Sequence, residues 1–244
     1  NGTASHAFAH ILYKALLFMS VGAVLFRTGT SKASELGGLY RTMPLTAIFC
    51  LVGAASISAF PLFSGFVTKS LIMDQAANQH YEFIWFVLVF ASAGVLSHSG
   101  IKVPFFAFFS HDSGLRPKEA PKHMLLAMGL TSALCIIIGV APVILYDYLP
   151  YEVNYKPYTS YHVINQLQLL CFAILSFILI KWFKMLPKEI RSINLDSDII
   201  YRKVLPIGLA YLISGLKKIA KSVKEICNSF GHISIAILQK LIGS

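Results

Sequence analysis

The chain has 244 residues, of which 56% are hydrophobic and only 13% are charged. Ordinary soluble domains carry roughly 25% charged residues, so this composition excludes a typical water-soluble fold and favours a membrane protein. The formal net charge of +10 would suit a nucleic-acid-binding protein, but the positive residues cluster in loops and in one tail, as they do in membrane proteins.

Five apolar stretches predict five crossings of a membrane. Each has 18 or more residues with few charges. At about 1.5 Å per residue, a helix of that length crosses the ~30 Å hydrocarbon core. The sequence therefore predicts an all-α, polytopic transmembrane helix bundle. In chain order the stretches are Ser5–Phe26, Pro44–Ala77, Phe83–Phe109, Met124–Leu145 and His162–Phe183.

The second stretch has 34 residues, too many for one simple crossing, and is broken near Pro61, Ser64 and Gly65. It is either a tight hairpin or one interrupted helix. Residues 27–43 before it carry three basic side chains, whereas residues 78–82 after it carry none. A hairpin would place both loops on the same side of the membrane, against the usual segregation of positive charge. We therefore predict one discontinuous helix.

Loop charge also predicts the orientation. Basic residues follow the third stretch at Arg116, Lys118 and Lys122, only Lys156 lies between the fourth and the fifth, and a basic tail follows the fifth. Because Lys and Arg concentrate on the cytoplasmic side, the first helix is expected to run inward and the tail to be cytoplasmic. The membrane expected is the bacterial cytoplasmic (inner) membrane.

The tail has a pattern of its own. Beyond Pro187 the chain becomes polar, and from Leu209 onward apolar residues recur at helical spacing with lysines mostly on the opposite face. This predicts an amphipathic helix on the anionic membrane surface or on a partner subunit, with a partly disordered basic tail as the alternative. The expected division is 1–110 for proton translocation, 111–183 for two further transmembrane helices and 184–244 for the tail.

Three titratable residues in the first stretch share one helical face. His6, His10 and Lys14 are four positions apart, so each turns only about 40° from the last. A lysine near the middle of a bilayer costs about 3 kcal/mol by insertion scales unless it faces water or a partner, and such residues usually mark ion pathways. Structural histidines and a snorkelling lysine are the alternatives. We interpret the three as a proton pathway, because titratable neighbours joined by water exchange protons.

Further members of the pathway are expected on the second and third stretches. Lys69 follows the break at Pro61 and Gly65, where backbone groups without helical partners need protein or water around them. Such hydration makes a buried lysine tolerable, and the alternative is a proline kink with Lys69 reaching the outer headgroups. His98 and Lys102, again four apart, lie toward the inner part of the third stretch, where snorkelling of Lys102 is the alternative.

The positions of the carboxylates and the motifs of the sequence restrict the classes of function to be considered. All eleven carboxylates lie outside the apolar centres, so an acidic partner for the buried lysines is expected from an upstream part or from a neighbouring subunit. The sequence has no glycine-rich phosphate loop, metal-ligand spacing or nucleophile arrangement, so no cofactor, metal or enzyme activity is expected. The chain starts at Asn1 rather than at a methionine and is expected to be the back part of a longer protein.

Four motifs carry a resemblance to a known family. They are His6-Ala-Phe-Ala-His10-Ile-Leu-Tyr-Lys14, Glu35-Leu-Gly-Gly-Leu39, Met43-Pro44-Leu45 and Phe60-Pro-Leu-Phe-Ser-Gly-Phe-Val-Thr-Lys69. The chain resembles the antiporter-like membrane subunits of Mrp-type sodium/proton antiporters and of respiratory complex I. The resemblance implies that Lys14 is the central proton carrier, that His6 and His10 belong to its hydrated axis, and that Lys69 sits at a discontinuous helix.

Two later motifs, Lys102-Val-Pro-Phe-Phe-Ala-Phe-Phe and Leu195-Asp-Ser-Asp-Ile-Ile-Tyr-Arg, look more like the Mrp D-type subunit. The resemblance therefore implies the C-terminal portion of a D-like subunit of a multisubunit monovalent cation/proton antiporter. The expected partners are other membrane subunits, the lipid bilayer, protons and a monovalent cation, Na⁺, with no nucleic acid. One alternative is a proton-pumping subunit of a complex I-like NADH:quinone oxidoreductase. The other is a truncated, non-transporting structural fragment, because the family's first inverted repeat and its glutamate and lysine coupling pair are absent here.

Overall fold

The computed structural model describes residues 1–185 and 197–242, with the side chains of residues 1–185, 197–222 and 224. Every regular element among these residues is a helix, which confirms the all-α prediction. The chain divides into two compact units, Asn1–Ile190 and Arg191–Ser244.

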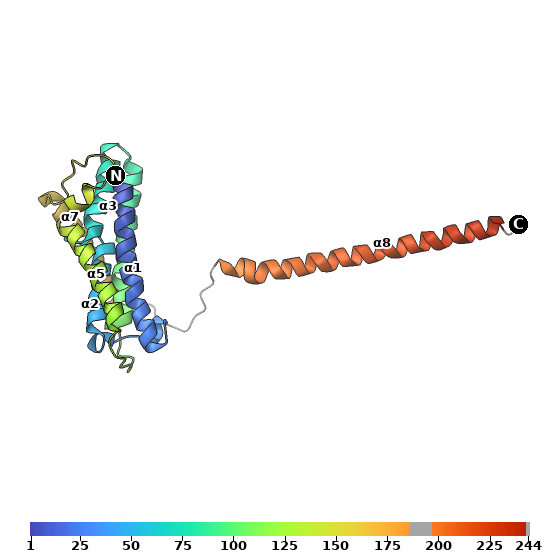
Figure 1. Ribbon diagram of the computed structural model, residues 1–244, viewed down its shortest axis with the longest axis horizontal. Coiled ribbons are helices and arrows are strands. Elements are labelled where there is room, and N and C mark those ends of the chain that lie inside the picture. Colours follow the sequence, from blue (N-terminus) through green and yellow to red (C-terminus); the bar gives the residue numbers. More distant parts are fainter. Residues whose placement is uncertain (186–196, 243–244) are drawn as a thin grey trace. The chain divides into compact units, whose positions relative to one another are not determined.

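Four helices of the first unit are long and apolar enough to cross a membrane. At the centre of this unit, α1 packs against α2, α3 and α5 (Figure 1). The predicted fourth stretch is interrupted at Pro142, after which the short helix α6 (Val143–Tyr146) follows. The four long helices are α1 (Gly2–Thr28), α4 (Glu82–Val95) with its continuation to Phe109, α5 (Lys122–Val140) and α7 (Ser160–Trp182).

The second predicted stretch is one discontinuous helix. It forms α2 (Pro44–Ile57) and α3 (Ser64–Asn78), and the two lie toward opposite ends of α1 (Figure 1). Residues 58–63 connect them in irregular backbone, with positive φ angles of 57° at Ala59 and 75° at Leu62. Together with the four long helices this gives five crossings, as the sequence predicted, and the hairpin alternative is wrong.

Two glycines allow close approach of backbones at this break. A Cβ atom on Gly65 would lie 1.8 Å from the carbonyl oxygen of Ser56, so α3 begins directly against the end of α2. A Cβ atom on Gly100 would lie 2.1 Å from Ser58 Oγ, so the third crossing also touches the break. Any larger residue at either position would push these segments apart.

The third crossing departs from regular α-helix. Beyond Val95 its backbone winds as π-helix over Leu96–Lys102 and again over Phe105–Phe109, with Pro104 between the two segments. π-Helical turns are rare and occur mostly as short insertions within α-helices, frequently at functional sites. The sequence predicted the extent of this crossing but not its winding.

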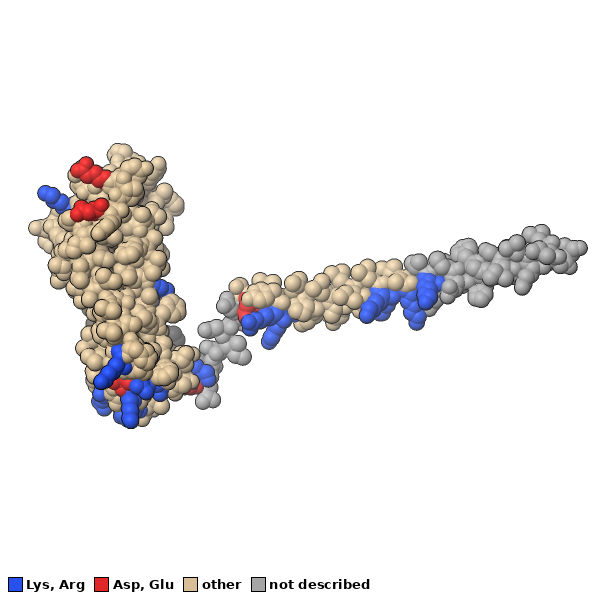
Figure 2. Space-filling model, in the orientation of Figure 1, with Lys and Arg blue, Asp and Glu red and all other residues tan. Residues whose placement is uncertain are grey.

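One end of the first unit is basic, and its loops hold the helices together. Figure 2 shows Lys and Arg side chains gathered at this end and acidic side chains at the other. Glu119 accepts hydrogen bonds from Leu45 N and Thr46 Oγ1 at the N-terminus of α2, and its own carbonyl accepts one from Arg27 Nε. A carboxylate in this position satisfies amide groups that have no partner within the helix. Arg116 and the backbone of Gly114 hold the pKa of the exposed Asp112 carboxyl well below its usual range.

The second unit contains the predicted tail helix. Helix α8 (Leu205–Ile242) has 38 residues and follows a π-helical turn at Ile200–Val204. Apolar side chains of its described part, such as Leu209, Leu212 and Ile219, are exposed, which leaves an apolar face available to lipid or to a partner. The polar stretch predicted beyond Pro187 and the first residues of the Leu195 motif lie outside the described residues.

Candidate functional site

The polar groups of α1 and α3 meet at His6. Its Nδ1 atom lies 3.1 Å from Thr68 Oγ1, and its Nε2 atom lies 3.4 Å from the hydroxyl of Tyr13. Thr68 Oγ1 also donates a hydrogen bond of 3.0 Å to the carbonyl oxygen of Ser64. Because the Thr68 proton is used there, the Thr68 oxygen accepts from His6 Nδ1, and Nε2 is then free to accept from Tyr13. This assignment gives neutral His6 one tautomer, with its proton on Nδ1.

His10 extends this group along α1. The His6 and His10 ring centroids are 6.0 Å apart, and the His10 ring meets the Tyr13 ring edge-on at 5.2 Å. Tyr13 is fully buried, His6 is half-buried and His10 is exposed on the surface of this unit. The helical spacing thus brings the two histidines together, with a buried phenol between them.

Lys69 lies at the break between α2 and α3. Its Nζ atom donates a hydrogen bond of 2.6 Å to the carbonyl oxygen of Ile57, the last residue of α2. The final carbonyls of a helix have no partner within it, and they carry the negative end of the helix dipole. The lysine therefore satisfies a backbone carbonyl that the break leaves without a helical partner. Lys69 is also near enough to His6 for electrostatic interaction.

Lys14 differs from the other members. It is partly exposed, and its ammonium lies 5.4 Å from the centre of the Phe18 ring. Among the residues that the structure describes, it makes no hydrogen bond or ion pair. A charge within a membrane crossing needs a polar partner or water, so this side of α1 is where another segment or subunit would contact the chain.

The two other predicted residues lie apart from this cluster. His98 is exposed and its Nδ1 atom is 3.4 Å from the neighbouring Ser99 Oγ. Lys102 is exposed at the end of the first π-helical segment. The structure does not bring either side chain to His6 or Lys69, and their part in a pathway stays a prediction.

Tyr13 and Thr68 were missed from the sequence, although both contact His6. The available signal was their position, because each lies next to a titratable residue inside an apolar run. As for a metal, no group of three or more His, Cys, Asp or Glu side chains comes together within the described part of the chain.

Residues 1–97, which include all of this cluster, match the family described as NADH:quinone oxidoreductase/Mrp antiporter, TM. Over these residues the chain is similar to the antiporter-like membrane subunits that the description names. The resemblance inferred from its motifs is thereby confirmed at the level of the family. The match does not identify which type of subunit this chain resembles most.

Many proteins and solved structures are similar to this chain. Hydrogenase-4 component B of Escherichia coli (strain K12) is 31% identical over 152 residues, which cover 57% of this chain and 23% of that protein. A probable K(+)/H(+) antiporter subunit of Rhizobium meliloti (strain 1021) is 28% identical over 144 residues, or 56% of this chain and 14% of that protein. The match thus spans less than a quarter of the length of either relative.

One solved structure is that of the membrane-bound sulfane sulfur reductase, an archaeal respiratory membrane complex. One of its chains superimposes with a TM-score of 0.56 at 21% identity, covering 93% of this chain and 43% of that chain. The likeness shows a shared helical fold.

Proposed function

We propose that this chain is a proton-translocating membrane subunit of a multisubunit monovalent cation/proton antiporter, in which protons move along His10, His6 and Lys69 with Lys14 as the central carrier. The observation that carries the proposal is the contact of His6 with Thr68, because it joins the titratable face of α1 to the helix of Lys69. Titratable groups inside membrane crossings usually mark ion or proton pathways.

The geometry around His6 supports a directional step. When Nε2 of His6 takes up a proton, the ring becomes an imidazolium, and the proton on Nδ1, beside Thr68, is then the one available for release to water near α3. The His6 and His10 ring centroids are 6.0 Å apart, close enough for water between the rings to carry a proton from one to the other. Lys69, whose ammonium donates to the Ile57 carbonyl at the break, accepts this proton after it has released its own.

The antiporter is preferred because the Lys102 motif looks D-like, and Na⁺ is the cation proposed. The Leu195 motif points the same way. The basic loops and the tail are assigned to the cytoplasm, and the membrane to the bacterial inner membrane, by the distribution of Lys and Arg. Other membrane subunits are the partners, and one of them, or another part of the same protein, supplies the acidic group that Lys14 needs.

A second candidate is a proton-pumping subunit of a complex I-like NADH:quinone oxidoreductase. The family's own description, which names both kinds of complex, favours keeping it. Proton exchange that depends on added Na⁺ supports the antiporter. Proton movement that depends on quinone reduction, and not on Na⁺, supports the second candidate.

The test uses inside-out membrane vesicles that contain the assembled complex, with a pH-sensitive dye to follow Na⁺-dependent proton exchange. Lys14→Leu and Lys69→Leu should each slow the exchange at least about tenfold, equivalent to ~1.4 kcal/mol on the rate-limiting step. Lys181→Leu is the matched control, since Lys181 is exposed at the end of α7 over the Phe105 ring. Full exchange in both variants, at normal levels of assembled complex, would disprove the proposed pathway.

A further inference from the structure

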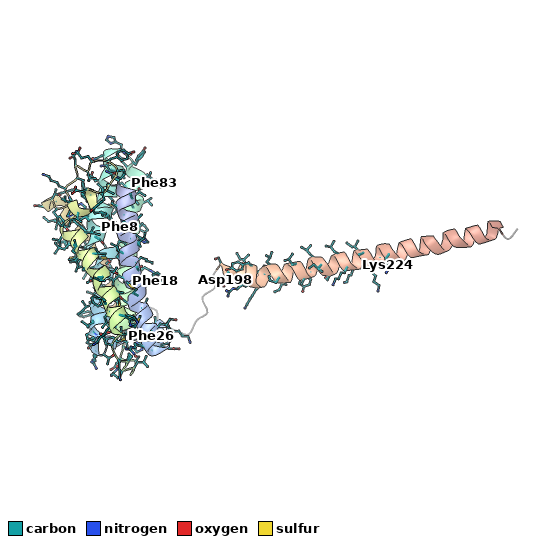
Figure 3. All side chains as sticks on the ribbon, in the orientation of Figure 1. Phe8, Phe18, Phe26, Phe83, Asp198 and Lys224 are labelled. Atoms are coloured by element: carbon teal, nitrogen blue, oxygen red, sulfur yellow. The ribbon has the colours of Figure 1, made fainter. Side chains whose placement is uncertain are left out.

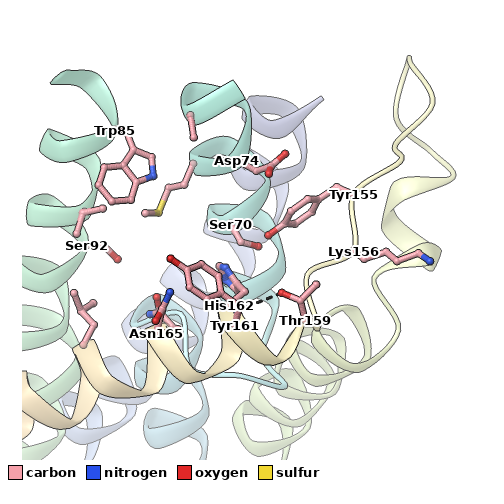
Figure 4. Close-up of a pocket in the computed structure, with 15 residues that line it drawn as sticks. Ser70, Asp74, Trp85, Ser92, Tyr155, Lys156, Thr159, Tyr161, His162 and Asn165 are labelled. Atoms are coloured by element: carbon pink, nitrogen blue, oxygen red, sulfur yellow. Dashed lines mark hydrogen bonds between the residues drawn. The ribbon is translucent and has the colours of Figure 1, made fainter. Parts of the chain in front are cut away.

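A cavity of about 630 Å³ lies between α3, α4, α7 and the segment that precedes α7. It opens at the end of the first unit that is opposite the basic loops. Polar side chains from three helices line it, and the close-up in Figure 4 shows several of them directed at one another. They are Ser70 and Asp74 of α3, Ser92 of α4, and His162, Asn165 and Gln166 of α7.

The lining contains one carboxylate and one ammonium group, those of Asp74 and Lys156. Asp74 is the only carboxylate among the lining residues, and its hydrogen bonds go to the neutral amides of Gln75 and Asn78. Lys156 also lines the cavity, but Figure 4 shows its side chain directed away from the group around Asp74. Burial raises the pKa of Tyr155, so its hydroxyl is neutral at neutral pH. The remaining titratable groups are Tyr161 and His162, so Asp74 sets the sign of the field.

The cavity also contains a polar group that needs water. The Nε2 atom of Gln166 is buried and has no hydrogen-bond partner among the described residues. Buried amide groups are nearly always hydrogen-bonded, either to protein or to an ordered water. The cavity has ample room for water, since one molecule takes about 30 Å³ in the liquid.

The surrounding surface reinforces the charge of Asp74. Three more carboxylates lie in or beside the segments at this end, namely Glu82, Asp147 and Glu152, against the single basic residue Lys156. Figure 2 shows acidic side chains at this end of the first unit. A cleft lined by one sign of charge raises the local concentration of ions of the opposite sign.

We propose that this cavity is a water-filled vestibule that admits small hydrated cations, hydronium included, and that Asp74 is the group that attracts them. The proposal rests on the proposed function, because it supplies the mouth of the pathway on the side opposite the basic loops. His162 lines the cavity, and its ring lies 4.8 Å from the ring of Phe66. Phe66 stands three residues before Lys69 on the same helix, so the vestibule borders the element that carries the proposed proton site.

Thiol accessibility tests the vestibule without relying on transport. In the assembled complex in membrane vesicles, Ser92→Cys is treated with two membrane-impermeant methanethiosulfonates of similar size, one carrying a trimethylammonium group and one a sulfonate. Relative to a free thiol, the cationic reagent should react about threefold faster or more, and only from the side opposite the basic loops. Asp74→Asn in the same background should remove the preference.

Matched controls isolate the effect. The parent chain measures the reaction of the native cysteines, and Ser176→Cys places a thiol within the membrane-spanning part of α7 outside the cavity, where neither reagent is expected to react. No reaction at Ser92→Cys from either side would overturn the proposal, because the cavity would then be dry. A preference that survives Asp74→Asn would overturn the role of Asp74.

Transport measurements separate this proposal from the proposed function. Asp74→Asn should raise the half-saturating concentration of cation on that side severalfold and leave the maximal rate unchanged, whereas Lys14→Leu should slow exchange at least about tenfold and keep the thiol pattern. If Lys14→Leu transports normally while the thiol preference is present, the proposed function fails and the vestibule stands. If the preference is absent while Lys14→Leu slows exchange in this way, the vestibule fails and the proposed function stands.

Discussion

Thr68 connects two helices through a single hydroxyl group. It accepts from His6 of α1 and donates to the carbonyl of Ser64 in its own helix, so one oxygen fixes the direction of both hydrogen bonds. In the low-dielectric interior of a bundle such bonds are electrostatically stronger than in water, and an unpaired polar group is correspondingly costly. His6 therefore depends on Thr68 for its orientation as well as for its protonation.

Replacing Thr68 by valine tests this role. Thr68→Val keeps the shape of the side chain but removes the oxygen, so His6 Nδ1 loses its acceptor and proton transfer toward α3 should slow about tenfold, or ~1.4 kcal/mol. The measurement is Na⁺-dependent proton exchange at equal amounts of assembled complex. Thr131→Val is the control, because the Thr131 hydroxyl bonds only the carbonyl of Ala127 in α5. Equal losses in both variants would contradict a specific role for Thr68.

At this scale the sequence predicted the titratable members of the candidate site and missed the hydroxyl groups of Tyr13 and Thr68 that contact His6. His6, His10 and Lys69 stand out because titratable groups are rare in apolar runs. Hydroxyl groups such as those of Tyr13 and Thr68 are common there, so nothing separates a relay hydroxyl from a packing residue until the helices are placed. Helical spacing also put the α1 residues on one face without indicating how deep each one lies.

The junction between α2 and α3 is the element on which the site depends. The chain turns there through six residues, and two of them, Ala59 and Leu62, hold left-handed backbone conformations that favour glycine. Gly65 lets α3 start against Ser56, and Lys69, about one turn further on, reaches back to the carbonyl of Ile57. The geometry of Lys69 therefore follows from the close fit of the two half-helices.

A methyl group at Gly65 should disturb that fit. Gly65→Ala places a carbon against the Ser56 carbonyl, so we expect a loss of about 1 to 3 kcal/mol in unfolding free energy and impaired proton exchange. Thermal unfolding of the detergent-solubilised complex measures the first effect. Gly22→Ala is the matched control, since no heavy atom lies within 4 Å of the added carbon and alanine favours helix by about 1 kcal/mol. A variant at Gly65 as stable as the control would show that the junction tolerates expansion.

Helix bounds were largely predictable, whereas the winding of the third crossing was not. Apolar length fixed the crossings to within a few residues, because each must span the same hydrocarbon thickness. The π-helical segments at Leu96–Lys102 and Phe105–Phe109 leave no mark on hydropathy, because hydropathy reports the composition of a stretch and not its winding. Proline and glycine located the break correctly, because they remove a donor or a side chain that regular helix uses.

Charged side chains are distributed unevenly along the first unit. Lys and Arg side chains gather at one end of this unit, and acidic side chains lie at the other end (Figure 2). The tail adds a second amphipathic surface, and Figure 3 shows the side chains projecting along the described part of α8, with Asp198 and Lys224 labelled. Such polarity predicts that the basic end and the tail face the cytoplasm.

Limited proteolysis tests this orientation. Trypsin should cut at the exposed Lys217 and Lys218 in inside-out vesicles and leave them intact in right-side-out vesicles. A glutamate-specific protease should cut at the exposed Glu152 with the opposite preference, which provides the control. Fragment masses identify the sites. Cleavage at Lys217 and at Glu152 from the same face would contradict a membrane crossing by α7.

The bond from Lys69 to the last carbonyl of α2 makes the charge on one side chain part of the joint between two half-helices. An ammonium forms a stronger hydrogen bond with that carbonyl than a neutral amine would, because a charged donor roughly doubles the strength of such a bond. Thermodynamic reciprocity then requires proton uptake by Lys69 and tightening of the joint to favour each other by the same free energy. Loss of a proton from Lys69 therefore weakens the joint between α2 and α3. A neighbouring protein that bends this joint in turn changes the proton affinity of Lys69.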